Sequence, residues 1–104
     1  MSNTGNAASP GGSDFNGILL VAENNAFNDT NPDIHAHAGV PLKVVISNKD
    51  FVRHDFIVDK LNINTAYLRT DQEFTTAIAS QSPGVFEYYC SLHPAQMRGK
   101  VIIS

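Results

Sequence analysis

The sequence predicts an all-β fold, a Greek-key β-sandwich or barrel of about seven to eight strands. Apolar and polar residues alternate with a period of two in several short runs. Clusters of Gly, Pro, Asn, Asp and Ser separate these runs at regular spacing. No segment shows the periodicity of an amphipathic helix over a convincing length. At 104 residues, the chain is long enough for one domain with its own core.

The first half of the chain contains three of the expected strands. Residues 15–22 form an apolar run, and the Asn- and Asp-rich residues 24–32 after it are expected to form a loop. Residues 33–38 alternate, with His35 and His37 on the face opposite the apolar side chains. If the apolar face is buried, the two histidines face water.

The third strand is expected over residues 41–48, where Leu42, Val44 and Ile46 point inward and Lys43 and Ser47 point outward. Residues 61–68 are too irregular to assign. The remaining strands are expected at residues 54–59, 72–79, 85–90 and 98–104.

The N-terminal residues differ in composition from the rest. Residues 1–14 are mostly Ser, Gly, Asn and Ala, which cannot bury apolar surface, so we expect a flexible linker or an added tail there. Of the two readings, we favour a linker from which an upstream export or anchoring segment was removed, with Met1 added at the cut, over a natural disordered tail. The folded domain is expected over residues 15–104.

Composition excludes several classes of function. The net charge is -3 with no basic cluster, which argues against binding to nucleic acid. No apolar run is long enough to cross a membrane. The single cysteine cannot form an internal disulfide, so it is either a core residue or a chemically used one.

The segment between the last two expected strands concentrates the chemistry. Cys90, His93 and Met97 supply a thiolate, an imidazole and a thioether within one short loop. A mononuclear copper centre of the blue type needs two imidazoles and one thiolate in a near-trigonal plane, with a weak axial Met. The second imidazole must come from elsewhere, and His54 is a good candidate.

Three stretches of the sequence, within a match over nearly all of residues 15–104, resemble the cupredoxin family, most closely its plastocyanin-like members with type 1 (blue or purple) copper. They are AFNDTNPDIHAHAGVPLKVVISNKD, FVRHDFIVD and SPGVFEYYCSLHPAQMRGKVIIS, the last with a Pro-Gly turn, an aromatic strand, Cys-x-x-His, a nearby Met and a Gly. The resemblance implies one copper per chain. His54, Cys90 and His93 would be its strong ligands and Met97 its axial ligand.

The resemblance also implies supporting roles. Asn48 matches the family asparagine that ties the two ligand-bearing loops together, and the backbone N–H of Asp55 would donate to the Cys90 sulfur. The chain departs from the family in having Asp, in place of Asn, after His54. The number of residues between His93 and Met97 varies in the family and is three here.

The resemblance implies an electron-transfer protein that cycles between Cu(II) and Cu(I). We expect transient redox partners to dock near His93, whose ring would reach the surface within a rim of Pro94 and Ala95. Tyr89 is a candidate second electron path. The chain is expected to be an extracytoplasmic monomer, at the cell surface, secreted or periplasmic, tethered by an upstream anchor if at all.

Alternative functions remain open at this point. A copper enzyme could act on nitric oxide or nitrite at an open axial position, and a copper storage or delivery protein would release its metal easily. A Cys–His nucleophile pair is disfavoured by the inward-facing Cys90 and the nearby Met97. His35 and His37 could chelate a stray metal ion, but we favour solvated surface residues.

Overall fold

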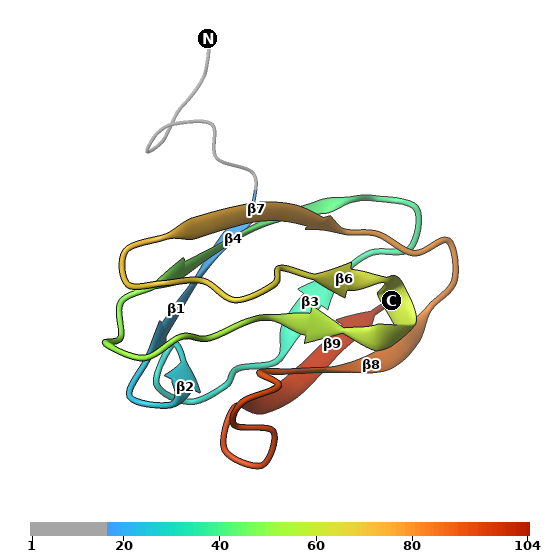
Figure 1. Ribbon diagram of the computed structural model, residues 1–104. Helices are drawn as coiled ribbons and strands as arrows, with labels where there is room; N and C mark the ends of the chain where they lie inside the picture. Colours follow the sequence, from blue (N-terminus) through green and yellow to red (C-terminus); the bar gives the residue numbers. More distant parts are fainter. Residues whose placement is uncertain (1–16) are drawn as a thin grey trace, which may run out of the picture.

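The computed structural model describes residues 17–104 as two packed β-sheets (Figure 1). The expected linker at residues 1–14 and the start of the first expected strand lie outside the described residues. The all-β sandwich predicted from the sequence is confirmed. In the described part, one sheet has the strand order β2-β1-β4-β7 and the other β3-β9-β8-β5-β6.

The first sheet contains β1 (Gly17–Glu23), β2 (Ala26–Phe27), β4 (Leu42–Asn48) and β7 (Glu73–Ile78). The second contains β3 (Ile34–Ala36), β5 (Ile57–Val58), β6 (Ile63–Asn64), β8 (Gly84–Tyr89) and β9 (Arg98–Ile103). Both sheets are mixed, because β1 runs parallel to β4 and β3 runs parallel to β9.

The described residues thus form nine strands where seven or eight were expected. The two additional strands are the two-residue β2, within the expected loop, and β6, within the unassigned segment. Residues 61–68 resisted assignment because they hold the end of a 3-10 helix (η1, Asp59–Leu61) and two residues with positive φ, Asn62 and Ala66. No helix within residues 17–104 is long and apolar enough to span a bilayer.

The core lies between the sheets and follows the predicted alternation in most strands. In β3, Ile34 and Ala36 are buried while His35 is exposed, as predicted. Removing apolar side chains from water in this way is the main stabilising contribution to the fold. The largest fully buried side chains, in order of volume, begin with Tyr88, Phe27, Phe56, Leu20 and Ile46.

The alternation fails at the end of β4, and the expectation that Ser47 faces outward is wrong. Ser47 is 2% exposed, and its neighbours Ile46 and Asn48 are also buried. Successive side chains of a strand point to opposite faces, so three buried residues in a row show that the strand end is covered on both faces. On the Asn48 face, the Asn48 amide donates to the backbone oxygens of Val52 (3.0 Å) and Leu68 (2.7 Å). A strand that is covered on both faces no longer shows a period of two.

The strand expected at residues 54–59 is also shorter than predicted, since only Ile57–Val58 is a strand. His54 forms an isolated bridge with Leu68, and η1 follows directly after β5. All of residues 54–58 are buried, which brings His54 into the interior at one end of the sandwich.

Gly99 allows the ring of Tyr88 to lie across β9. The two residues are paired in the β8–β9 register, and a Cβ at position 99 would overlap the ring and hydroxyl of Tyr88. Tyr88 is fully buried and donates to the backbone oxygen of Pro32 at 2.7 Å, so its ring has little freedom to move aside.

We therefore expect Gly99→Ala to lower the free energy of unfolding by about 1–3 kcal/mol, the usual cost of overpacking. Urea unfolding followed by circular dichroism would measure this change. Gly39→Ala is a useful comparison, because Gly39 has a positive φ of 78° but a Cβ there would meet only Oε1 of Gln81, at an ordinary contact distance of 3.8 Å. A stability for Gly99→Ala equal to that of the original chain would contradict the close packing of Tyr88.

Candidate metal centre

The loop between β8 and β9 is curled by its own backbone hydrogen bonds. The N–H of Cys90 donates to the carbonyl of Met97 (3.0 Å), which closes the loop where the two strands end. Inside it, the N–H groups of His93 and Met97 donate to the carbonyls of Cys90 (3.1 Å) and His93 (2.8 Å). Pro94 follows His93 and fixes its own φ, which restricts the turn further. One short, curled loop thus carries three of the four predicted ligands.

The two sulfur-containing side chains of this loop and its histidine differ in their exposure to solvent. Cys90 and Met97 are fully buried, while His93 is half-buried. The predicted inward direction of Cys90 is therefore confirmed. The soft sulfur donors lie in the interior, and only the His93 ring reaches toward solvent.

His54 completes the cluster from a distant part of the chain. Its Nδ1 lies 3.7 Å from the Cys90 sulfur, and Nδ1 of His93 lies 3.9 Å from the same sulfur. One nitrogen of each histidine and the sulfur all lie within 4.8 Å of one another. The long-range pairing of His54 with the ligand loop, predicted from the sequence, is present.

These distances fit a metal ion. A metal bound about 2.0–2.1 Å from nitrogen and about 2.3 Å from sulfur, at a trigonal angle, separates the two atoms by about 3.8 Å. The two observed nitrogen–sulfur distances lie close to this value. Among the described residues, this is the one group of at least three His, Cys, Asp or Glu residues that could hold a metal ion.

The environment of the Cys90 thiol has opposing effects on its pKa. Burial is the largest effect and raises the pKa, and the Asp55 carboxylate raises it further. Backbone hydrogen bonds from Asp55 and Leu92 to the sulfur act in the opposite direction, and the first of these was expected from the resemblance. The same two N–H groups would lower the electron density on a metal-bound sulfur.

Asp50 orients the ring of His54 and was missed in the sequence. Its carboxylate lies 2.9 Å from Nε2 of His54, and this hydrogen bond is the main reason why the pKa of Asp50 is lowered. With Nε2–H donating to Asp50, the unprotonated Nδ1 faces the Cys90 sulfur. The sequence offered one sign of this contact, an aspartate four residues before the candidate ligand His54.

Asp55 connects the two ligand-bearing segments, and this corrects the role given to Asn48. The Asp55 carboxylate accepts from the N–H of Ser91 (2.7 Å) and from its hydroxyl (2.6 Å). Asn48, in contrast, binds the backbone of Val52 and Leu68 and accepts from the N–H of Asp50, so it holds the His54 segment alone. Asn48 therefore positions the segment that carries His54, and Asp55 links that segment to the ligand loop.

A further anchor of the ligand loop comes from Asn31. Its side-chain amide donates to the carbonyl of Gln96 (2.8 Å), and its side-chain oxygen accepts from the N–H of Phe27 (2.9 Å). Asn31 has a positive φ of 50°, a conformation that Asn tolerates better than most residues. The sequence did not distinguish Asn31 from the other asparagines of the same loop.

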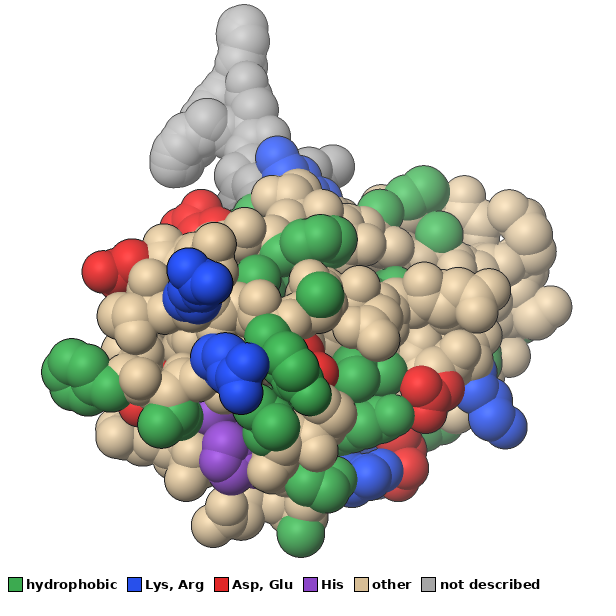
Figure 2. Space-filling model, viewed as in Figure 1, with side chains coloured by type: hydrophobic (Ala, Val, Ile, Leu, Met, Phe, Trp, Pro, Cys, Tyr) green, Lys and Arg blue, Asp and Glu red, His purple; other side chains and the backbone are tan. Residues whose placement is uncertain are grey.

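Exposed apolar side chains lie on the two segments that form the site. Phe51 is 95% exposed, and Val52 and Leu92 are also exposed, with Pro94 and Ala95 on the same ligand loop. Figure 2 shows hydrophobic side chains gathered around a histidine at the lower left of the molecule, beside basic side chains. We call the surface formed by these five residues the apolar rim.

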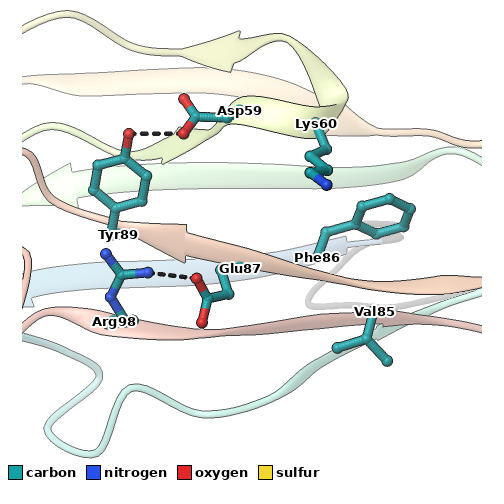
Figure 3. A pocket seen from close by; sticks show the side chains of 7 residues that line it. All are labelled: Asp59, Lys60, Val85, Phe86, Glu87, Tyr89 and Arg98. Carbon is teal, nitrogen blue, oxygen red and sulfur yellow. Dashed lines mark hydrogen bonds and ion pairs between the residues drawn. The ribbon is translucent and has the colours of Figure 1, made fainter.

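Tyr89 faces a separate groove of about 440 Å³ on the outside of β8 (Figure 3). Its hydroxyl donates to the Asp59 carboxylate (2.9 Å), which is the main reason why the pKa of Tyr89 is raised. The Arg98 guanidinium lies 5.0 Å from the centre of the Tyr89 ring and pairs with Glu87 (2.6 Å). Tyr89 is thus fixed next to Cys90 on the outer face, as its place in the strand predicted.

Fold and site together define a class of protein: a β-sandwich with a metal-binding cluster of two imidazoles and one thiolate, on a loop that also carries the buried Met97. The chain matches the family model of the cupredoxin-like domain over residues 13–103. It therefore belongs to the cupredoxin family, and its cofactor is copper, which this donor set suits.

Solved structures agree on the fold. The Cu(I) form of an amicyanin mutant has a TM-score of 0.65 at 20% identity, covering 86% of this chain and 83% of the other. A reduced amicyanin mutant has a TM-score of 0.66 at 20% identity, with coverages of 88% and 86%. A copper-containing nitrite reductase from Thermus scotoductus has a TM-score of 0.71 at 17% identity over 85% of this chain, which spans 27% of that enzyme. No curated protein matches the chain.

Proposed function

We propose that this protein carries single electrons through one type 1 copper ion held by His54, Cys90, His93 and Met97. The observation that supports this best is the convergence of three donor atoms within 4.8 Å, one of them from a segment distant in sequence. Copper in such a site supplies a one-electron couple between Cu(II) and Cu(I).

The protein's own residues keep the donor atoms in place. Asp50 holds the His54 ring in one tautomer, Asp55 joins the two segments through Ser91, and Asn31 holds the far side of the ligand loop. Donor atoms fixed by hydrogen bonds of this kind change position little when the charge of the bound ion changes. Small movement favours fast electron transfer, because little reorganisation is needed.

The test of this function is reversible one-electron redox chemistry. Adding Cu(II) to the metal-free protein should give intense visible absorption at one copper per chain. Stepwise reduction and reoxidation should bleach and restore it along a one-electron titration curve. Slow or incomplete recovery, or release of copper on reduction, would favour storage or delivery over electron transfer.

We also propose that redox partners dock on the apolar rim. His93 is the half-buried ligand of the site, and the exposed Phe51 and Leu92 lie on the two segments that carry the ligands. Small interfaces of this type form brief complexes, which suits repeated electron delivery. An extracytoplasmic location and a monomeric state remain part of the proposal.

Electron self-exchange between two copies of the protein measures access to this surface without an identified partner. We expect Phe51→Asp to slow self-exchange at least about tenfold, because it removes an apolar contact and makes two like charges approach each other. NMR line widths in mixtures of the oxidised and reduced protein report this rate. Val85→Asp is the matched control, since Val85 is 62% exposed on β8 and is outside the apolar rim. Equal slowing by both variants would contradict docking on the rim.

A further inference from the structure

Two of the four histidines of the chain lie outside the copper centre, on β3 and directly after it. His35 and His37 are both exposed, and both line a hollow of about 180 Å³ bordered by Val40, Pro41 and Leu42. Neither imidazole has an ion-pair partner among residues 17–104, and no Lys or Arg lines the hollow. Two exposed imidazoles without ion-pair partners in the described part of the chain therefore line one surface hollow.

The backbone directs the two side chains to the same face of the sheet. Residues two apart in an extended segment project from the same face, with an axial separation of about 7 Å. That spacing lets two imidazoles reach one ion, each bound through nitrogen at about 2.0 Å. β3 is also the edge strand of its sheet, paired through β9 alone, so an ion can approach from the open side.

The hydrogen bonds of His37 favour metal binding. Its Nδ1 lies 3.2 Å from the Ser104 hydroxyl, and this hydroxyl is directed toward the carbonyl of Ala36 at 3.5 Å. In the tautomer in which Nδ1–H of His37 donates to the Ser104 hydroxyl oxygen, Nε2 is the ring nitrogen available to an ion. Metal-binding histidines in proteins are held by the same arrangement, with the second ring nitrogen donating to an oxygen.

We propose that His35 and His37 form a second metal site that binds one divalent first-row transition-metal ion, Cu(II) most tightly. Imidazole nitrogen suits copper, zinc and nickel, and Cu(II) binds such ligands more strongly than its neighbours in the series do. Water completes the coordination shell at this exposed position. The net charge of -3 also favours the approach of a cation.

This site is separate from the electron-transfer centre. His35 is paired with Ile102 near the end of β9, whereas the copper-ligand loop precedes the first residue of β9, Arg98. The two sites therefore lie toward opposite ends of one strand. The second site serves as a surface position for loosely held copper, and its existence does not depend on the electron-transfer proposal.

The experiment uses the copper-loaded, oxidised protein after brief treatment with EDTA to remove loosely bound metal. Cu(II) is then added, and bound copper per chain is measured together with the electron paramagnetic resonance spectrum. We expect one additional copper per chain with a tetragonal signal that shows coupling to nitrogen. In amide NMR spectra, Cu(II) should broaden residues near His35 and His37 first.

Variants locate the site. His35→Ala and His37→Ala should each weaken binding of the additional copper by about tenfold or more, and Ser104→Ala should weaken it by a smaller factor. Thr75→Ala, an exposed position on β7, is the matched control and should change nothing. The visible absorption of the first centre should be the same in all four variants, so failure at one site can be told from failure at the other.

Two results would overturn the second site. One is the absence of any additional copper per chain. The other is retention of that copper, with the same affinity and tetragonal signal, when His35 and His37 are both replaced by alanine.

Discussion

Replacing Cys90 with serine is expected to remove the intense visible absorption of the copper-loaded protein almost completely. The absorption of a type 1 site arises from charge transfer between the thiolate sulfur and copper, and a serine hydroxyl provides no such donor. The substitution changes one atom at a fully buried position, so the fold should remain intact. Copper affinity should fall as well, because the soft ligand that favours Cu(I) is lost.

The measurement is a visible spectrum at a known copper-to-protein ratio, with circular dichroism to show that the variant is folded. His35→Ala is the control, since it removes an exposed imidazole that lies outside the centre and should leave the band unchanged. An intense band in folded Cys90→Ser protein would mean that the copper does not bind this sulfur.

Replacing Asp55 is expected to have the second large effect, a change in the reduction potential of the bound copper. The Asp55 carboxylate is 3% exposed and close enough to the Cys90 sulfur to raise the pKa of its thiol. A negative charge there stabilises the oxidised ion, which carries one more positive charge than the reduced ion. Asp55→Asn removes this charge and keeps the shape of the side chain, so the reduction potential should rise.

The size of the rise follows from electrostatics. A unit charge several ångströms away, at an effective dielectric constant of about 20, contributes roughly 2–3 kcal/mol. For a one-electron couple this corresponds to about 100 mV, since about 59 mV changes the equilibrium constant tenfold. Cyclic voltammetry of the two proteins would measure the shift, and an unchanged or lowered potential would contradict the argument.

A second substitution separates charge from structure. Asp55→Ala also removes the acceptors for the N–H and hydroxyl of Ser91, so it should loosen the ligand loop and speed the loss of copper to a chelator. Asp55→Asn retains one acceptor and should lose copper at nearly the original rate. Equal rates of copper loss in both variants would show that the Asp55–Ser91 connection does not hold the loop.

Much of this protein follows from its sequence because the relevant signals are local. Period-two alternation and turn residues predict the sandwich, and the burial of Ile34 and Ala36 confirms one such pattern. Cys90, His93 and Met97 lie within eight consecutive residues between two strands, so a short loop must bring them close together. A soft sulfur beside an imidazole then limits the metal to a few elements.

The tertiary structure alone decided which distant residues support the site. The period-two pattern misplaced Ser47 because the end of β4 is covered on both faces, which no local pattern reveals. Asp55, and not Asn48, joins the ligand segments, since the partner of a carboxylate depends on which loops meet in space. The same holds for Asp50 and Asn31, whose hydrogen bonds hold His54 and the ligand loop. Local sequence sets the chemistry of the donors, but packing between segments far apart in the chain sets their orientation.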